Sequence, residues 1–237
     1  MKKSYILFAL ALLISCKSNN NKTIADTSDY LSNIKSELKK EWPKNRTINL
    51  VFHGHSVPAG YFKTPVVNTL ASYPYQVLKK IKELYPYSVI NIINTSIGGE
   101  NSISGERRFE KEVLVHNPDL IFIDYALNDA GVGLEKSKAA WEKMIQKALD
   151  RHIKVILLTP SPDQRINISE PDNDLGKHAQ QIRALSKEYG VGLADSYEIF
   201  RNLAVSGDSL KNYMSQVNHP NEKGHLLIAG AIMKYFE

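Results

Sequence analysis

Five short apolar runs, separated by segments of helical periodicity, constrain the fold of this chain more than any other feature. The runs are residues 48–53, 89–94, 120–125, 153–159 and 191–195. Several are apolar almost throughout instead of alternating with polar residues, which is typical of strands that are covered on both faces. Strands that alternate with helices pair in parallel through right-handed crossovers. The sequence therefore predicts an α/β fold, with a doubly wound parallel five-stranded sheet in a three-layer α/β/α sandwich.

The helices expected around this sheet follow from apolar residues three or four positions apart. Their markers are Tyr75, Leu78, Ile81 or Lys82, and Tyr85; Trp141, Met144, Ile145 and Ala148; Leu175, Ala179, Ile182, Leu185 and Tyr189; and, in a last amphipathic helix, Leu226, Leu227, Gly230, Ile232, Met233 and Phe236. We expect a further helix before the sheet, from the helical spacing of Tyr30, Leu31, Ile34, Leu38 and Trp42. Residues 26–28 are its candidate caps, and Pro43 would end it.

The beginning of the chain has the features of an export signal. Lys2 and Lys3 precede an apolar run over residues 5–14, which is too short to span a membrane comfortably. The only cysteine, Cys16, ends the sequence Leu-Ile-Ser-Cys, which resembles the lipobox of bacterial lipoproteins, where the cysteine is acylated after cleavage. An ordinary secretion signal that happens to contain a cysteine is the alternative. We therefore expect a lipid anchor on Cys16.

The length of 237 residues fits one domain with a sizeable core. We expect a lipoprotein signal peptide over residues 1–15, a tether over 16–26 and one domain over 27–237 that includes the N-terminal helix. The expected location is the bacterial cell envelope, where the lipid anchor holds the protein to a membrane facing the periplasm or the exterior. Removing the signal peptide takes away two lysines and no acidic residue, so the net charge falls from +5 to +3. With no basic cluster beyond Lys39 and Lys40, this charge does not argue for binding to nucleic acid.

Polar and glycine-rich segments follow three of the expected strands. Residues 54–56, with the sequence Gly-His-Ser, come after the first strand; residues 94–102 follow the second, and residues 126–129 the third. A late segment, Asn-His-Pro at 218–220, precedes the last helix. In open parallel sheets, ligands bind beyond the carboxyl ends of the strands, so we expect all four segments to lie on one rim.

Over residues 46–237 the chain resembles the SGNH hydrolase family, also called GDSL esterases and lipases. That family carries serine, glycine, asparagine and histidine in four ordered blocks on a flavodoxin-like sheet. The matching residues are Ser56, Gly99, Asn128 and His219. Taken singly, each of these residues also fits an ordinary turn, loop or helix cap, but their order and their placement after the strands together indicate a catalytic set.

The resemblance implies a serine esterase that needs no cofactor. Ser56 would attack an ester carbonyl while His219 takes its proton, through an acyl-enzyme. The oxyanion that forms requires hydrogen-bond donors already aimed at it. The backbone N–H groups of Ser56 and Gly99 and the side-chain amide of Asn128 would supply them, and glycine at position 99 lets the main chain come close to the substrate.

Two departures from the family pattern lie beside the serine and the asparagine. The family usually has aspartate before its serine, and His55 stands there in this chain. Ala126 stands where the third block usually opens with glycine. Because His55 replaces that aspartate, other groups must make the local hydrogen bonds that the aspartate makes in the family.

The largest departure lies in the histidine block, where the family has an aspartate three residues before the histidine and this chain has Gln216. A glutamine carbonyl can accept a hydrogen bond from the ring of His219 and fix its tautomer, but it has no charge to stabilise the imidazolium. We expect Gln216 to orient His219. The alternatives are Asp195 at the end of the fifth strand, Asp208, and a backbone carbonyl.

Two other motifs suggest competing sites. Residues 207–210 spell Gly-Asp-Ser-Leu, but they follow no strand and lie close before His219, so we expect Ser209 to be structural. His53 and His55 form a His-x-His pair that could open a metal site, yet no ordered series of further ligands follows it, and we expect no metal. The remaining histidines, His116, His152 and His178, are expected to be solvated or at helix ends.

The substrate class follows from the resemblance and the expected location. We expect an anchored envelope hydrolase of this family to remove acetyl groups from a carbohydrate or polysaccharide. Cleavage of lysophospholipids or thioesters is the alternative with the same chemistry, and a non-catalytic carbohydrate-binding lipoprotein is the alternative from another class. Residues 161–172 form a long connection expected to line the substrate rim, with Asp163 and Arg165 facing sugar hydroxyls or solvent. Residues 61–63 would form the opposite wall.

Overall fold

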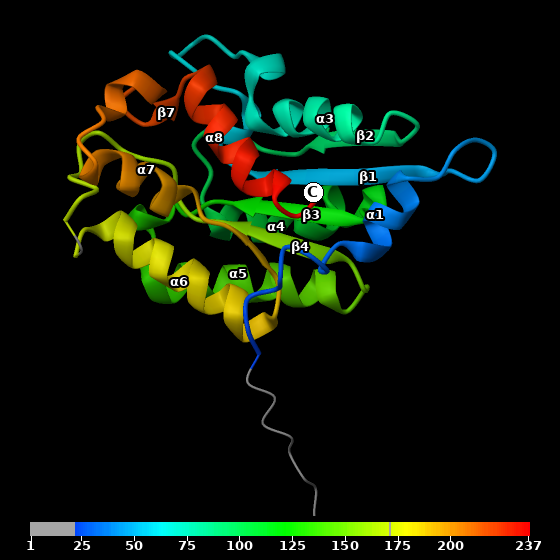
Figure 1. The fold of residues 1–237 in the computed structure, drawn as a ribbon. Coiled ribbons are helices and arrows are strands. Elements are labelled where there is room, and N and C mark those ends of the chain that lie inside the picture. Colours follow the sequence, from blue (N-terminus) through cyan, green and yellow to red (C-terminus); the bar gives the residue numbers. More distant parts are fainter. Residues whose placement is uncertain (1–21, 171) are drawn as a thin grey trace, which may run out of the picture.

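A computed structural model of the chain describes residues 22–170 and 172–237. The expected signal peptide, the acylated Cys16 and the first part of the tether lie outside the described residues. The described part is an α/β sandwich with helices on both sides of a central sheet (Figure 1). It contains no helix that is long and apolar enough to cross a membrane.

The five predicted strands are confirmed and form one parallel sheet in the order β2-β1-β3-β4-β5. Their bounds are Thr47–Gly54 (β1), Val89–Asn94 (β2), Leu120–Asp124 (β3), Lys154–Leu158 (β4) and Gly192–Ala194 (β5). The strand order reverses beside β1, and in open sheets the ligand crevice lies at such a switch point. A ligand is therefore expected between the loops that follow β1 and β3.

Two apolar layers cover the sheet. Alternate β1 residues point to opposite faces: Leu50 and Phe52 enter one buried cluster and Val51 the other. The first cluster includes the buried faces of α1 (Ser32–Leu38), α3 (Tyr73–Leu84), α7 (Ser196–Val205) and α8 (Glu222–Met233). The second includes the buried faces of α4 (Ser102–Glu112) and α5 (Leu134–Leu149). Helix α6 (Asp174–Tyr189) contributes to both clusters. Burial on both faces explains why the strand sequences are apolar almost throughout.

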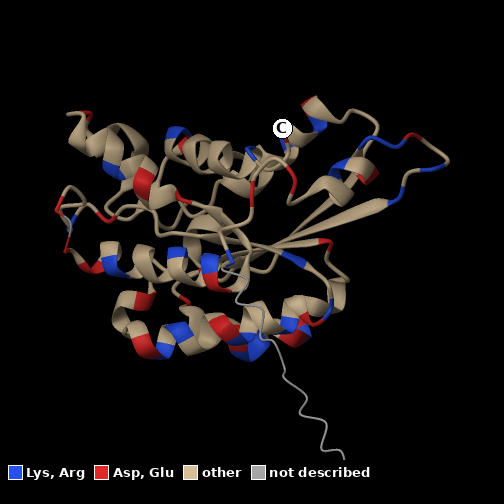
Figure 2. Cartoon of the chain, turned by 60° about the horizontal axis from the view of Figure 1, so that its bottom comes forward, with Lys and Arg blue, Asp and Glu red and all other residues tan. Residues whose placement is uncertain are grey.

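Shorter elements complete the chain. They are α2 (Ser56–Ala59), the 3₁₀ turns η1 (Thr69–Ala71), η2 (Leu114–His116), η3 (Asp129–Gly131) and η4 (Leu210–Tyr213), and the antiparallel pair β6 (Met214–Gln216) and β7 (His219–Pro220). Over the outer helices, acidic and basic residues are interspersed (Figure 2).

Several helix predictions need correction. The first helix ends at Leu38, has no side-chain cap from residues 26–28, and leaves Trp42 outside it and 84% exposed. In α3 the buried stripe is Tyr73, Val77 and Ile81 instead of Tyr75 and Leu78, because the aromatic residues at its start gave the wrong helical phase. A histidine expected at the surface, His178, lies inside α6 and is buried.

The final helix and three other elements also differ from the prediction. Leu226 is exposed, and α8 buries His225, Ile228 and Ile232. Helices α4 and α7 and the β6–β7 hairpin were not expected. The hairpin is too short to show an alternating pattern in the sequence.

The described chain begins at the edge of the sheet opposite the predicted site. The backbone N–H of Ala25 donates to the carbonyl of Val191, 3.1 Å away, just before β5 begins. The hydroxyl of Tyr235 donates to the Ala25 carbonyl. These bonds hold the first described residues beside the amino end of β5, whereas Ser56 and Asn128 follow the carboxyl ends of β1 and β3.

Candidate active site

The serine lies on a tight turn between β1 and the short helix α2. The ring of His55 caps this helix, because its Nδ1 accepts a hydrogen bond from the Val57 backbone at 3.2 Å. Gly54 lets β1 approach β3 closely: a Cβ on it would lie 2.4 Å from the Asp124 carbonyl oxygen. The backbone N–H of His55 donates to that same carbonyl at 3.2 Å. Ser56 is thereby held at the carboxyl edge of the sheet.

The histidine comes from the hairpin near the other end of the chain. His219 lies on β7 and pairs with Gln216 on β6. Its Nε2 lies 2.9 Å from the hydroxyl oxygen of Ser56, within hydrogen-bond distance across 163 residues of sequence. Burial lowers the pKa of His219 below its ordinary value, the Phe62 carbonyl opposes this shift, and His55 adds to it. The ring is therefore neutral near pH 7 and can accept a proton.

The tautomer of His219 follows from the groups around its other nitrogen. Nδ1 lies 2.9 Å from the backbone carbonyl oxygen of Phe62, which can only accept, so Nδ1 carries the hydrogen. Nε2 is then unprotonated and can accept the hydroxyl hydrogen of Ser56, as a general base must. The group that orients the base is thus a backbone carbonyl, and no pattern in the sequence identified which one.

Gln216 does not orient His219 in the way we predicted. Its carbonyl oxygen accepts a hydrogen bond from the Thr64 backbone at 3.0 Å, so its amide nitrogen is the atom that faces His219 Nδ1, at 2.8 Å. Because Nδ1 carries a hydrogen, the Gln216 amide nitrogen and His219 Nδ1 are both donors, and no hydrogen bond forms between them. Gln216 instead ties the hairpin to the segment that follows the serine turn.

The two alternative acids lie elsewhere in the fold. Asp195 receives hydrogen bonds from Arg183 and Thr159 and caps α7. Asp208 receives them from Tyr213 and Asn212. Within the described residues neither contacts His219, so both alternatives are wrong.

The predicted oxyanion donors lie on the loops after β1, β2 and β3. Gly99 adopts a left-handed φ of 82°, which favours glycine, and no atom would lie within 4 Å of an added Cβ. The amide nitrogen of Asn128 donates one hydrogen to the carbonyl of Glu100 at 2.8 Å, which ties the second loop to the third. Among residues 22–170 and 172–237, the backbone N–H groups of Ser56 and Gly99 have no acceptor. They remain available to an oxyanion.

Asp129, which the sequence reasoning missed, fastens the asparagine loop from behind. Its carboxylate accepts from the Ser102 backbone at 2.8 Å and from the indole of Trp141 at 2.7 Å. Burial raises the pKa of Asp129, while these two hydrogen bonds act in the opposite direction. The Asn-Asp order at 128 and 129 was visible in the sequence, but the partners of the aspartate come from α4 and α5.

The position of His55 explains how the missing aspartate of the first block is replaced. His55 is fully buried, and its Nε2 lies 3.4 Å from a carboxylate oxygen of Asp124, the last residue of β3. The other oxygen of Asp124 accepts from the hydroxyl of Tyr73 at 3.0 Å. A buried histidine, carboxylate and phenol therefore connect the serine turn to β3 and α3.

The possible metal site at His53 and His55 is occupied by protein contacts. The two nitrogens of His53 face the hydroxyl of Thr95 and, on the other side, the Gly105 carbonyl and the hydroxyl of Tyr125, all within 3.1 Å. Burial lowers the pKa of His53 to about 3, so it is neutral. In the described part of the chain, no group of three or more candidate metal ligands comes together.

The remaining predicted segments surround the hairpin. Gln164, in the long connection after β4, donates from its backbone to the Val217 carbonyl at 2.8 Å and from its side chain to the Gln216 carbonyl at 3.1 Å. Arg165 pairs with Asp163 next to it. The ring of Tyr61 lies 6.2 Å from that of His219. The long connection thus braces the hairpin, and Tyr61 forms a wall beside the histidine.

Ser209 is separate from this constellation. It is exposed in the loop before η4, and its neighbour Asp208 is bonded within that loop. The catalytic set predicted from strand exits, and not the literal Gly-Asp-Ser-Leu sequence, is the one that brings a serine to a histidine.

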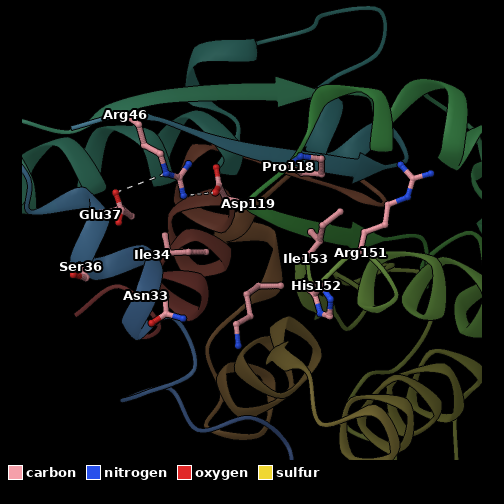
Figure 3. A pocket seen from close by; sticks show the side chains of 11 residues that line it. Asn33, Ile34, Ser36, Glu37, Arg46, Pro118, Asp119, Arg151, His152 and Ile153 are labelled. Carbon is pink, nitrogen blue, oxygen red and sulfur yellow. Dashed lines mark hydrogen bonds and ion pairs between the residues drawn. The ribbon is translucent and has the colours of Figure 1, made fainter. Parts of the chain in front are cut away.

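A cavity of about 360 Å³ opens at the opposite edge of the sheet (Figure 3). There Arg46 is paired with Asp119 and Glu37, and Arg151 extends away from this cluster. The cavity lies beside the amino ends of β3 and β4, so it does not belong to the catalytic rim.

Comparison with known proteins supplies a family match. The model of the GDSL-like Lipase/Acylhydrolase family matches residues 52–227. A comparison with curated proteins finds no match.

Solved structures resemble the chain over most of its length. A two-domain esterase active on acetylated mannans is 20% identical with a TM-score of 0.71, covering 89% of this chain and 54% of its own. An acetylxylan esterase from Geobacillus stearothermophilus is 18% identical with a TM-score of 0.69, covering 80% of this chain and 94% of its own. A further acetyl xylan esterase is 21% identical with a TM-score of 0.65. At these identities, the likeness establishes the fold. The chain spans about half the length of the two-domain esterase.

Proposed function

This chain belongs to the GDSL-like Lipase/Acylhydrolase family of ester-hydrolysing serine hydrolases, and we propose that it removes acetyl groups from a carbohydrate. The single observation that carries a catalytic role is the 2.9 Å contact between Ser56 and the unprotonated nitrogen of His219. The substrate class is supported by the structural neighbours, which are described as esterases of acetylated xylan and mannan.

In the proposed reaction, the Ser56 hydroxyl oxygen attacks the acetyl carbonyl carbon and its proton passes to His219 Nε2. The carbonyl oxygen becomes an oxyanion, and the N–H groups of Ser56 and Gly99 and the amide of Asn128 donate to it. The Phe62 carbonyl accepts from Nδ1–H and stabilises the imidazolium with a dipole instead of a full charge. When the intermediate collapses, the bond to the sugar oxygen breaks, and that oxygen takes the proton from His219 Nε2 and leaves as a hydroxyl group, with the acetyl group on Ser56.

The second half of the reaction releases acetate. A water molecule gives a proton to His219 and attacks the acetyl-serine carbonyl, and the same three donors hold the second oxyanion. When that intermediate collapses, Ser56 leaves with the proton and acetic acid is formed. No metal or cofactor enters either half.

Hydrolysis of p-nitrophenyl esters of increasing chain length tests the proposal. We expect the chain without residues 1–21 to prefer acetate over longer acyl groups and to release acetate from acetylated xylan or mannan. A preference for long acyl chains would favour lysophospholipid or thioester substrates instead. A folded protein that turns over none of these esters would be a binding protein.

We also propose that Cys16 carries a lipid that holds the enzyme at a membrane of the bacterial cell envelope. This proposal rests on the resemblance of residues 13–16 to a lipobox. Cys16→Ser is expected to release the protein in soluble form or to leave an uncleaved precursor, as fractionation and mass spectrometry would detect. Unchanged membrane association with normal cleavage would contradict the lipid anchor.

A further inference from the structure

A second hollow, which none of the proposed chemistry uses, opens between helices α3 and α8. Its volume is about 660 Å³, within the range of small-molecule sites. We call it the α3–α8 groove; the residues that matter for its chemistry are Leu70, Tyr75, Gln76, Lys79, Glu222 and Leu226.

The groove begins beside the catalytic turn. Asn68, which also lines it, donates from its backbone to the carbonyl of Gly60, the residue that ends α2 just after Ser56. Glu222 stands at the start of α8, three residues after His219. Below the groove, the helices are joined by the bond from the Tyr73 backbone to His225 Nδ1. The groove therefore lies next to the segment that follows the serine turn.

Gln76 brings an amide to the groove. It is only 9% exposed, it lines the groove, and its amide makes no hydrogen bond with any part of residues 22–170 and 172–237. The amide is not among the buried polar atoms that lack a partner in the described residues, so water reaches it from the groove. Hydroxyl groups on a molecule in the groove can replace that water at the two donors and the acceptor of the amide.

The other lining groups match the same chemistry. Leu70 and Leu226 are large apolar residues exposed at the surface, and the ring of Tyr75 lies between buried and exposed. Together they offer an apolar surface to the C–H face of a sugar ring. Lys79 and Glu222 carry opposite charges, so the groove has no net charge that would favour a polyanion or a polycation. A neutral molecule with apolar faces and many hydroxyls fits best.

We infer that the α3–α8 groove is a glycan subsite, which binds sugar units of a neutral oligosaccharide at a distance from the scissile ester. This inference deepens the proposed function and rests on it. The subsite holds the polymer next to the segment that follows the serine turn, and so raises kcat/KM for deacetylation of polymers relative to that for small esters.

The experiment measures binding apart from turnover. Unacetylated xylohexaose and mannohexaose are titrated into the full-length chain, followed by calorimetry and by amide chemical shifts. We expect one of them to bind and to shift the amides of α3 and α8. Gln76→Leu and Tyr75→Ala should weaken that binding by roughly 3- to 10-fold, the effect of one net hydrogen bond or contact. The matched control is Glu83→Ala, on an exposed part of α3 outside the groove, which should bind as the wild type does.

Kinetics provide the second measurement. The ratio of kcat/KM on acetylated hexaose to kcat/KM on p-nitrophenyl acetate should fall by roughly 3- to 10-fold in each groove variant and not in Glu83→Ala. Tyr75→Ala keeps the test valid if Gln76→Leu does not fold, since Tyr75 is partly exposed.

The outcomes separate the two proposals. No hexaose binding, binding that ignores both groove variants, or a change in sedimentation that shows the groove to be a contact between copies would overturn the subsite. If hexaose binds in the groove but no acetyl ester is hydrolysed, the proposed function fails and the subsite stands.

Discussion

Ser56 stands on a turn joined to the middle of the sheet, whereas His219 stands on a two-stranded hairpin at its rim. The serine turn is held by β1 and β3, by the close approach at Gly54 and by the buried pair of His55 and Asp124. The hairpin strands have three and two residues, with an irregular register between Met214 and Gln216. Contacts from other segments hold the hairpin.

This difference explains which substitutions the site accommodates. On the serine side, replacing the usual aspartate by His55 brings in a side chain that faces the buried Asp124 carboxylate, where a second acid would be repelled. On the histidine side, Gln216 replaces an acid and the Phe62 carbonyl orients the ring instead. On the serine side a buried side chain stands in place of the usual aspartate, and on the hairpin side a backbone carbonyl takes over the role of the usual acid.

The largest effect is expected where the two halves meet. Ser56→Ala removes the nucleophile and should lower kcat on p-nitrophenyl acetate by at least about 10³-fold, as removing such a residue does in other serine hydrolases. Ser209→Ala is the control and should leave the rate within about twofold, a margin typical of surface changes. Loss of activity in Ser209→Ala with retention in Ser56→Ala would overturn the assignment.

The rigid half is tested by His55→Asp. This change places two carboxylates together in a buried site, so the free energy of unfolding should fall by roughly 2 kcal/mol or more. Displacement of the serine should lower kcat by about 10²-fold. Adding Asp124→Asn to this variant should restore much of the lost free energy of unfolding and much of the lost kcat. A double-mutant cycle, measured by urea unfolding and by kinetics, tests this. If the two substitutions are additive, the coupling between His55 and Asp124 is refuted.

The hairpin half is tested by restoring an acid at position 216. In Gln216→Glu, one carboxylate oxygen can keep the bond from the Thr64 backbone while the other accepts from His219 Nδ1–H. The added charge stabilises the imidazolium and should raise kcat by up to about tenfold; the loss of 10⁴-fold known for the opposite change in serine proteases is only an upper guide.

Two companions sharpen this result. Gln216→Asp is one methylene shorter and should gain less, and Gln216→Ala should lose slightly, because only the tie to Thr64 disappears. If all three variants keep the rate and the pH profile of the parent, position 216 does not act on His219 and the Phe62 carbonyl is its sole orienting group.

The smallest effect is in the pH profile. Burial lowers the pKa of His219 below its ordinary value of 6.5, so the ring stays unprotonated at a pH somewhat below 6.5. The value of kcat/KM should be retained in that range and lost only as the pH falls through the lowered pKa. In Gln216→Glu the added carboxylate raises this pKa, so the acid limb should move to higher pH. A parental midpoint at or above pH 6.5 would contradict the burial of the base.

The sequence predicted those parts of the molecule that depend on local patterns. Apolar runs in the sequence predict the five strands. The polar and glycine-rich segments that follow these runs predict the rim that carries Ser56, Gly99 and Asn128. The contacts of Gln216 and His219 do not follow from such patterns, because the Thr64 amide that binds Gln216 and the Phe62 carbonyl that binds His219 come from a segment about 150 residues away. The burial of His178 and the phase of α3 depend on which neighbours cover each helix, and periodicity alone does not determine that.

If the protein is anchored through Cys16, the bond between Ala25 and Val191 limits how far the domain can extend from the membrane. Parallel strands share a direction, so a chain held at the amino end of β5 leaves the domain on the side away from Ser56. If Cys16 carries the lipid, the six residues from there to Lys22 extend at most about 20 Å. The domain would then sit close to the bilayer with its catalytic edge facing outward. Such an enzyme would process polymers that arrive from outside the membrane, and lipids of its own membrane would stay beyond its reach.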